Sequence, residues 1–249
     1  LLESAKKHWL DQGVDDHLFH HVSTDEVYGS LKPTDLAFKE SSPYAPNSPY
    51  AASKAASDHL VRAYHKTYGL KVTTSNCSNN YGPFQFPEKL IPLCLLNVLN
   101  GKPLPIYGEG TQVRDWLYVD DHCYGIELIL KGGAVGETYN IGGSNEWRNI
   151  DVVELLCETV QTKFERSPEL RVRFSQSPCA KNQDPKQLIT HVEDRLGHDT
   201  RYAIDAGKAI RELNYKPAVT FEDGLRRTVD WYLGSEDWWQ AILNGSYRI

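Results

Sequence analysis

The segments STDEVYG at residues 23–29 and YAASK at residues 50–54 decide the fold and indicate the chemistry. Residues 17–23 have the composition of a buried strand, and residues 50–68 have that of a helix. Residues 71–75 are rich in β-branched side chains and predict the next strand. A strand, a helix and a second strand in this order predict a parallel α/β sheet.

Tyr50 and Lys54 form a YxxxK pattern, and their spacing places them on one face of the helix. A free Tyr side chain titrates near ~10, so a Tyr that acts as a base at neutral pH needs a cationic neighbour. Lys54 can stabilise the Tyr50 phenolate from this position. A lone YxxxK is more often a surface pair, but its place after an acidic strand end favours a catalytic interpretation.

Asp25 and Glu26 directly follow the predicted strand. Adjacent carboxylates are more often solvated turn or helix-cap residues. At the carboxyl end of a parallel strand, however, they lie where open α/β sheets bind ligands. Because like charges raise a neighbour's pKa, one carboxyl can stay protonated as an acid while the other acts as a base.

The composition argues against several functional classes. The chain has 249 residues, of which 40% are hydrophobic and 24% charged, and its net charge of −6 argues against general nucleic-acid binding. No apolar run approaches the ~18 residues of a membrane span. Five cysteines without a CxxC pair predict a reduced, cytoplasmic protein with no structural metal.

The glycine-rich dinucleotide turn is missing, because neither GxGxxG nor GxxGxxG occurs. That turn normally follows the first strand of a dinucleotide-binding fold, so we expect the first strands to lie upstream of Leu1. The sequence also contains no Met and opens inside an amphipathic segment. We therefore expect it to be part of a longer polypeptide.

The remaining pattern continues the alternation of strands and helices. It predicts strands at residues 103–107, 116–119 and 137–141 and a β-like stretch at 170–174. It predicts helices at residues 1–12, 93–99, 121–131, 151–162, 205–213 and 221–233.

Arg114, Arg195 and His198 are candidate anion ligands, since an Arg can hold a diphosphate with two parallel hydrogen bonds. Individually, each is more often an ordinary surface cation, and the sequence does not show whether the three meet. The segment NNYGP at residues 79–83 is similarly consistent with a simple turn.

These motifs together resemble the dTDP-glucose 4,6-dehydratase family of the extended short-chain dehydrogenase/reductase superfamily. The matching stretches span nearly the whole chain and are STDEVYG (23–29), YxxxK (50–54), NCSNNYGP (76–83), FPEKLIP (86–92), LPIYG (104–108), RDWLYV (114–119), YNIGG (139–143) and DRLGHD (194–199). YxxxK and YNIGG recur across the superfamily, whereas Thr-Asp-Glu is typical of the dehydratases. The family often has Pro where Leu196 stands.

For the fold, the resemblance implies a doubly wound parallel sheet of the Rossmann type, with its N-terminal strands absent from this chain, and a smaller α/β substrate-binding lobe. A partial NAD-binding domain is expected at residues 1–81 and 109–138, and a nucleotide-sugar-binding domain at 82–108 and 139–249. Family members are usually homodimers through two helices per subunit, and the helix from Tyr50 is expected to be one of them.

For the chemistry, the resemblance implies NAD-dependent conversion of dTDP-glucose to dTDP-4-keto-6-deoxyglucose and water. Tyr50 would deprotonate the 4-hydroxyl, Thr24 would hydrogen-bond that oxygen, and Lys54 would hold the nicotinamide ribose and lower the pKa of Tyr50. Glu26 would remove the C5 proton and Asp25 would protonate the departing 6-hydroxyl, before hydride returns to C6. The resemblance leaves open whether the product serves rhamnose or another deoxysugar.

The binding residues that the resemblance implies fall into two groups. The cofactor positions are Ser23, Tyr50, Lys54, Cys77 and Asn79. The substrate positions are Asn79, Lys89, Leu90, Pro105, Tyr107, Arg114, Asn149, Arg195 and His198. Within this group, Pro105 and Tyr107 would contact thymine, while Arg195 and His198 would bind the diphosphate.

Three other functions compete with this interpretation. A nucleotide-sugar 4-epimerase needs no acid/base pair at C5 and C6, so Asp25 and Glu26 argue against it. A GDP-mannose 4,6-dehydratase usually has a different residue before the Glu, which is a weaker argument. A non-catalytic nucleotide-binding protein should have lost Tyr50, Lys54 or the carboxylates, and all four are present.

Overall fold

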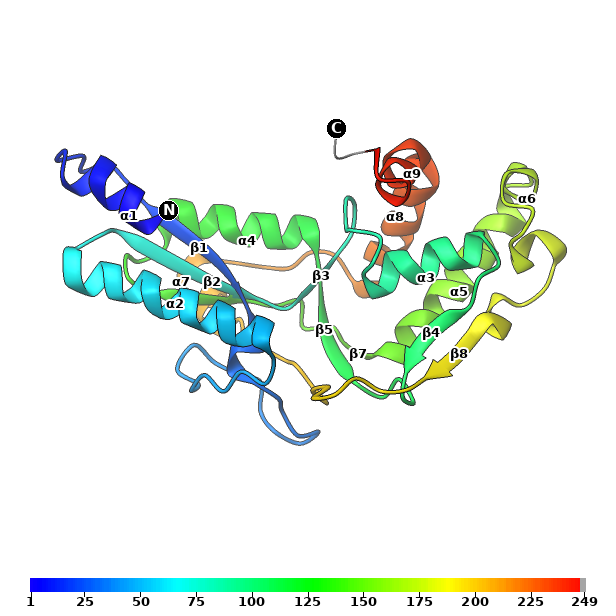
Figure 1. Ribbon diagram of the computed structural model, residues 1–249, viewed down its shortest axis with the longest axis horizontal. Coiled ribbons are helices and arrows are strands. Elements are labelled where there is room, and N and C mark those ends of the chain that lie inside the picture. The colour runs from blue at the N-terminus through cyan, green and yellow to red at the C-terminus, as the bar shows by residue number, and fades with distance from the viewer. Residues whose placement is uncertain (247–249) are drawn as a thin grey trace. The chain divides into compact units, whose positions relative to one another are not determined.

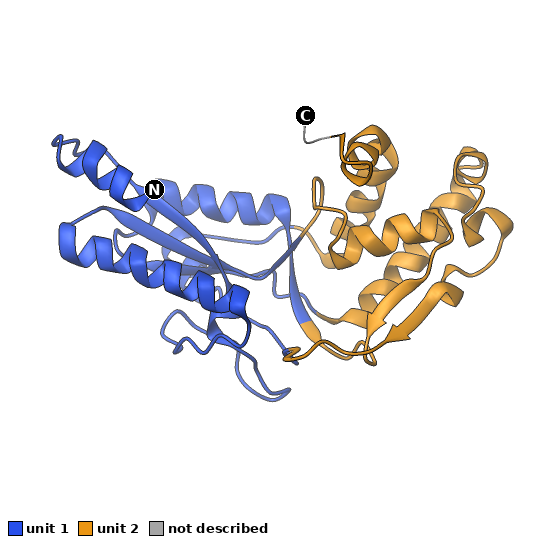
Figure 2. Ribbon diagram, viewed as in Figure 1, with its two compact units in different colours: residues 1–80, 114–146, 199–218 blue, residues 81–113, 147–198, 219–249 orange. Residues whose placement is uncertain are grey.

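The computed structural model describes residues 1–246 of the chain, and its helices and strands are labelled in Figure 1. They form two compact units, coloured separately in Figure 2. Unit 1 comprises Leu1–Asn80, Arg114–Glu146 and Asp199–Ala218, and unit 2 comprises Tyr81–Val113, Trp147–His198 and Val219–Ile249. Residues 247–249, which the second predicted domain includes, lie outside the described residues.

The units differ from the predicted domains in four places. Residues 139–146 and 199–218 belong to unit 1, and Tyr81 and residues 109–113 belong to unit 2. The first difference arises because β6 (Thr138–Ile141) pairs with β2 (Val72–Cys77) in the sheet of unit 1.

The sheet of unit 1 confirms the predicted parallel α/β architecture. Its three strands lie in the order β1 (Phe19–Thr24), β2 and β6, and both pairings are parallel. In this register Ser23 lies opposite Asn76, and Asn76 lies opposite Asn140. The polar ends of all three strands therefore meet at one edge of the sheet.

Two long helices cover opposite faces of this sheet, α2 (Pro49–Tyr68) and α4 (Val119–Gly132) (Figure 1). The side chain of His21 bonds to Asp58 of α2, whereas the charge of its neighbour His20 lowers the pKa of His122 on α4. Adjacent residues of a strand point to opposite faces, so the two helices lie on different sides. The shorter elements of unit 1 are α1 (Leu2–Ala5), a π-helical turn (Lys6–Leu10), a 3₁₀ turn (Asp25–Tyr28) and α7 (Gly207–Leu213).

The α2 helix begins and ends where its sequence predicts. The side chain of Ser48 accepts a hydrogen bond from the Ala51 amide at 3.0 Å, and Pro49 occupies the first helical position. Gly69 ends the helix in the left-handed conformation, with φ of 78°. This local capping sets the position of Tyr50 in the first turn.

Unit 2 is built around α5 (Asn149–Arg166), which packs against α3 (Leu90–Leu99) and α8 (Phe221–Gly234). Strands β4 (Leu104–Tyr107) and β8 (Ile189–Val192) form a parallel pair. The other elements are α6 (Glu169–Arg173), α9 (Glu236–Leu243) and 3₁₀ turns at Pro178–Lys181 and Pro185–Leu188. A second three-stranded sheet consists of β3 (Asn79–Tyr81), β5 (Val113–Tyr118) and β7 (Glu146–Arg148).

One predicted element is wrong in type, and another differs in its bounds. The β-like stretch at residues 170–174 is instead the helix α6, in which Leu170 is buried while Val172 is 83% exposed. Its apolar residues therefore do not share one buried strand face: Leu170 and Phe174 are buried, whereas the helix that follows Pro168 exposes Val172 between them. The expected helix at residues 1–12 is α1 followed by the π-helical turn, and it ends at Leu10.

Within residues 1–246, no helix combines the length and apolar character that crossing a membrane requires. The same residues contain no group of three His, Cys, Asp or Glu side chains arranged to hold a metal ion.

Two histidines, the buried His122 and the partly buried His20, make unit 1 sensitive to acid. Burial, and secondarily His21, lowers the pKa of His20 to about 4. Burial, and secondarily His20, lowers the pKa of His122 to about 4. Because both pKa values lie below the unfolded value near 6.5, the unfolded state binds more protons between these limits, and stability is lost as the pH falls from about 6.5 towards about 4.

We therefore expect His122→Asn to reduce this acid-induced loss of stability by about 2 kcal/mol, after allowance for partial exposure. The measurement is urea unfolding at about pH 7 and about pH 5, where histidine charge changes. His8→Asn, at an exposed position, is the control and should behave as the unchanged protein. An equal loss of stability in the His122 variant and the unchanged protein would contradict the assignment.

Candidate functional site

The Thr-Asp-Glu segment lies at the carboxyl end of β1, where the chain enters a 3₁₀ turn. The Thr24 hydroxyl accepts a hydrogen bond from the Glu26 amide at 3.3 Å and donates to Asp25 Oδ1 at 3.4 Å. Thr24 therefore caps the turn, and both carboxyl groups stand in its first residues. This is the strand end at which the sequence predicted an acid/base pair.

The surroundings of Asp25 favour its protonated form. Its side chain is 2% exposed, and within residues 1–246 its Oδ2 atom has no hydrogen-bond partner. Burial raises the pKa of Asp25 well above its usual value, the carboxyls of Glu26 and Asp115 raise it further, and Arg114 opposes them. The direction agrees with the sequence prediction, but burial contributes more than the neighbouring like charge. A raised pKa favours the protonated carboxyl, which is the form that can donate a proton.

Tyr50 and Lys54 stand in the first turns of α2, in the same unit as the carboxyls. Tyr50 is 56% exposed, and the Lys54 ammonium donates a hydrogen bond to the Val22 carbonyl at 2.8 Å. Burial, followed by Glu26 and other anionic groups, raises the pKa of Tyr50. The prediction that Lys54 lowers the pKa of Tyr50 is wrong for this structure. The Lys54 ammonium bonds to a strand carbonyl, and the negative charge of the nearby carboxylates raises the pKa of the phenol.

The positions expected to bind NAD gather around the ends of β1 and β2. Cys77 lies opposite Thr24 in the sheet, and its thiol lies 3.4 Å from the Ser23 carbonyl oxygen. Asn79 has a buried Oδ1 atom without a hydrogen-bond partner in the described part of the chain. A phenol, an ammonium and a free amide oxygen are groups that bind ribose hydroxyls and a carboxamide, so the residues fit NAD.

Arg114 lies on β5 in unit 1 and is 8% exposed. Its Nη2 atom donates to the Asp199 carbonyl at 2.9 Å, and its guanidinium lies 4.4 Å from the centre of the Tyr202 ring. The Asn47 amide also donates to Asp199, at 2.7 Å. The structure therefore places Arg114 where its charge acts on Asp25, whereas the sequence grouped it with nucleotide-binding residues.

In unit 2, three predicted nucleotide-binding residues meet at the end of β4. The Arg195 guanidinium lies 4.1 Å from the centre of the Tyr107 ring, and the His198 ring lies edge-on to Tyr107 at 6.3 Å. His198 Nδ1 is 2.6 Å from Asp194 Oδ1, and the Gln112 amide donates to Asp194 Oδ2 at 3.0 Å. Neither Asp194 nor Gln112 was among the predicted site residues, although Asp194 opens the DRLGHD motif.

The other predicted substrate residues occupy nearby parts of unit 2. Pro105 lies on β4 opposite Thr190 of β8. Asn149 begins α5, and its backbone amide donates to the Gln112 carbonyl at 3.0 Å. The Gln112 side chain in turn bonds to Asp194, which links Asn149 to the residues around Tyr107. Lys89 and Leu90 stand at the beginning of α3, where Lys89 forms an ion pair with Glu88 at 3.2 Å.

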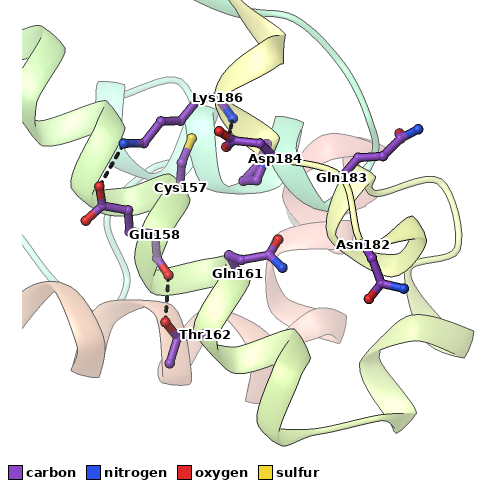
Figure 3. A pocket seen from close by; sticks show the side chains of 9 residues that line it. Cys157, Glu158, Gln161, Thr162, Asn182, Gln183, Asp184 and Lys186 are labelled. Atoms are coloured by element: carbon purple, nitrogen blue, oxygen red, sulfur yellow. Dashed lines mark hydrogen bonds and ion pairs between the residues drawn. The ribbon is translucent and has the colours of Figure 1, made fainter.

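A separate hollow of about 420 Å³ in unit 2 is lined by residues of α5 and of the segment 182–186, and Figure 3 shows it from close by. It contains none of the predicted site residues. Lys186 pairs with Glu158 at 2.7 Å, and Asp184 accepts the Lys186 amide at 2.9 Å. Because these charges already have partners, the hollow does not require a ligand.

Comparison with known proteins connects the chain with sugar-nucleotide dehydratases. A family profile described as GDP-mannose 4,6 dehydratase matches residues 1–228. The dTDP-glucose 4,6-dehydratase of Neisseria meningitidis serogroup B is 55% identical over 252 residues, which cover 100% of this chain and 68% of that protein. The enzyme of the same name from Salmonella typhimurium is 51% identical over 259 residues, with the same coverage of both chains.

Solved structures agree with these sequence matches. DesIV, a dTDP-glucose 4,6-dehydratase from Streptomyces venezuelae with NAD and TYD bound, is 47% identical with a TM-score of 0.81, covering 96% of this chain and 66% of that one. A Thermus thermophilus UDP-glucose 4-epimerase with NAD is 26% identical with a TM-score of 0.76, covering 94% and 68%. The chain thus spans about two thirds of the length of the proteins that it matches.

Proposed function

Because the chain belongs to the dTDP-glucose 4,6-dehydratases, within the broader GDP-mannose 4,6 dehydratase family, we propose that the full-length protein converts dTDP-glucose to dTDP-4-keto-6-deoxyglucose and water. One observation carries this proposal. Asp25 is buried with a raised pKa beside Glu26, in the unit that also holds Tyr50 and Lys54. A 4-epimerase has no use for a protonated carboxyl next to a second carboxyl.

The first stage is removal of the proton from the sugar 4-hydroxyl, and we assign it to Tyr50. Thr24 would donate a hydrogen bond to the same sugar oxygen, while Lys54 would hold the nicotinamide ribose. NAD, held by Ser23, Tyr50, Lys54, Cys77 and Asn79, would supply the hydride acceptor at C4 and the hydride donor at C6. Oxidation at C4 makes the C5 proton acidic, so a modest base suffices for the next stage.

The second stage is elimination of water, and we assign it to the pair at the end of β1. Glu26 takes the C5 proton, and the electron pair of that C–H bond forms the C5–C6 double bond. The C6–O bond breaks, and Asp25 transfers its proton to the departing oxygen, which leaves as water. The raised pKa of Asp25 supplies the protonated acid that this step needs.

We assign the nucleotide half of the substrate mainly to unit 2. Tyr107 and Pro105 would contact the base, and Arg195 and His198 would bind the diphosphate. The other residues that we propose to contact the substrate are Asn79, Lys89, Leu90, Arg114 and Asn149. The stacked Arg195 and the edge-on His198 already surround Tyr107, which supports a common binding role. A cytoplasmic location and a homodimer that uses α2 remain predictions.

The test is turnover of the full-length protein with dTDP-glucose, followed by the absorbance of the 4-keto-6-deoxy sugar in alkali. UDP-glucose and GDP-mannose serve as parallel substrates. We expect dTDP-glucose to be preferred by about 10²-fold or more in kcat/KM. Preference for GDP-mannose would reassign the substrate, and formation of dTDP-galactose without a keto sugar would make the protein an epimerase.

A further inference from the structure

We propose that Asp58 is a positioning residue that fixes the strand end bearing Thr24, Asp25 and Glu26 against the helix bearing Tyr50 and Lys54. The inference rests on the proposed function, since it concerns how the two halves of that active site are held together. Asp58 is 6% exposed, and both of its carboxylate oxygens are already bonded to protein side chains, so we assign it no contact with substrate.

Three side chains from two parts of unit 1 bond to Asp58. His21 Nε2 lies 2.8 Å from Asp58 Oδ1. The hydroxyl of Ser23 donates to Oδ2 at 3.0 Å, and the hydroxyl of Tyr44 donates to the same atom at 2.9 Å. A buried carboxylate is stable only with such partners, and here its partners come from the catalytic strand and from the loop before α2.

The spacing along α2 makes this contact part of a two-point attachment. Lys54 and Asp58 are four residues apart and share one helix face. Lys54 holds the carbonyl of Val22, while Asp58 holds the side chains of His21 and Ser23 on either side of it. Three successive residues of β1 are thereby attached to the helix immediately before the Thr-Asp-Glu segment.

A polar row extends the attachment across the sheet. The Asn76 amide donates to the Tyr28 hydroxyl at 2.8 Å and to the Tyr44 hydroxyl at 3.4 Å. The Tyr28 hydroxyl donates to Asn140 Oδ1 at 2.9 Å. Since Ser23, Asn76 and Asn140 are paired in register, the row joins all three strands beneath the catalytic turn. Loss of Asp58 would therefore release the strand end but leave the fold of the sheet intact.

The expected effect is on rate, not on substrate affinity. Misplacement of a catalytic group by about 1 Å can lower the rate by about 10²-fold. Asp58→Asn keeps the shape of the side chain but replaces one acceptor oxygen with a donor that faces hydroxyl and imidazole groups. We expect kcat per NAD-loaded site to fall by about 10- to 10²-fold, with KM for dTDP-glucose changed by less than about twofold.

Two companion variants make the test specific. Ser57→Ala is the matched control, because the Ser57 hydroxyl bonds only within α2, to the Ser53 carbonyl at 3.0 Å, among the bonds recorded for residues 1–246. It should leave kcat unchanged. Tyr44→Phe removes one of the three donors to Asp58 and should lower kcat by about threefold, again without changing KM.

Amide hydrogen exchange supplies a readout that does not depend on turnover. In Asp58→Asn, exchange should become faster at residues 22–28 and 49–58 and stay unchanged in unit 2. If kcat per loaded site is unchanged and only the Tm falls, Asp58 is merely structural and the proposal is overturned. If the unchanged protein does not convert dTDP-glucose, the proposed function fails. The positioning role of Asp58 is then decided by amide exchange alone: faster exchange in Asp58→Asn that is confined to residues 22–28 and 49–58 supports it, and unchanged exchange there overturns it.

Discussion

Replacing Tyr50 with Phe is expected to lower kcat for dTDP-glucose by about 10²- to 10⁴-fold, the usual contribution of a positioned base. The variant keeps the ring but loses the hydroxyl that would accept the proton of the sugar 4-hydroxyl. Because Tyr50 is 56% exposed, the loss should not weaken the fold. The measurement is steady-state turnover with dTDP-glucose, together with KM and the amount of bound NAD.

Tyr68→Phe provides the control for this variant. Tyr68 lies at the other end of α2 and is 49% exposed, so it shares the helix and the chemistry of Tyr50 but not the catalytic position. It should retain full activity. Comparable rates for Tyr50→Phe and the unchanged protein would show that another group removes the hydroxyl proton.

The second large effect separates the roles of Glu26 and Asp25. We expect Glu26→Gln to lower both product formation and the exchange of the C5 proton with solvent deuterium by about 10²-fold or more, because it removes the base. Asp25→Asn should lower product formation by about 10²-fold yet retain C5 exchange, because it removes only the acid. Proton NMR of the sugar in deuterated water, alongside the keto-sugar assay, measures both quantities.

The same assignment has a pH signature. Burial raises the pKa of Asp25, so the protonated acid should persist through neutral pH, and elimination should slow as the pH rises through that raised pKa. Asp15 and Asp16 form an exposed pair of adjacent carboxylates, and conversion of both to Asn is the control that should change neither readout. Normal C5 exchange in Glu26→Gln would exclude Glu26 as the base.

The local elements around the site were predictable because their signals lie close together in the chain. Ser48 and Gly69 mark the two ends of α2, and YxxxK follows from its first turn. The strand, helix and strand order was sufficient to predict a parallel sheet, which β1, β2 and β6 confirm. It also placed Asp25 and Glu26 at the carboxyl end of a strand.

The charge states and supports of the site were not predictable in the same way. The sequence indicated that one carboxyl would have a raised pKa, but burial is the larger cause for Asp25, and burial depends on segments far apart in the chain. The prediction that Lys54 lowers the pKa of Tyr50 was wrong, because spacing along a helix does not show that the Lys54 ammonium bonds to the Val22 carbonyl. Helix α6 was mistaken for a strand for a related reason, because nothing local shows that Val172 faces solvent.

By itself, the sequence determined the parallel α/β class, the extent of α2 and which residue types stand at the end of β1. Each of these depends on residue spacing within one element or on the order of neighbouring elements along the chain, which the sequence specifies. Only the tertiary structure decided that Asp58 bonds to His21, Ser23 and Tyr44, and that Arg195 stacks on Tyr107. Packing brings these residues together from distant parts of each unit, where burial and electrostatic interaction depend on distance in space and not on distance along the chain.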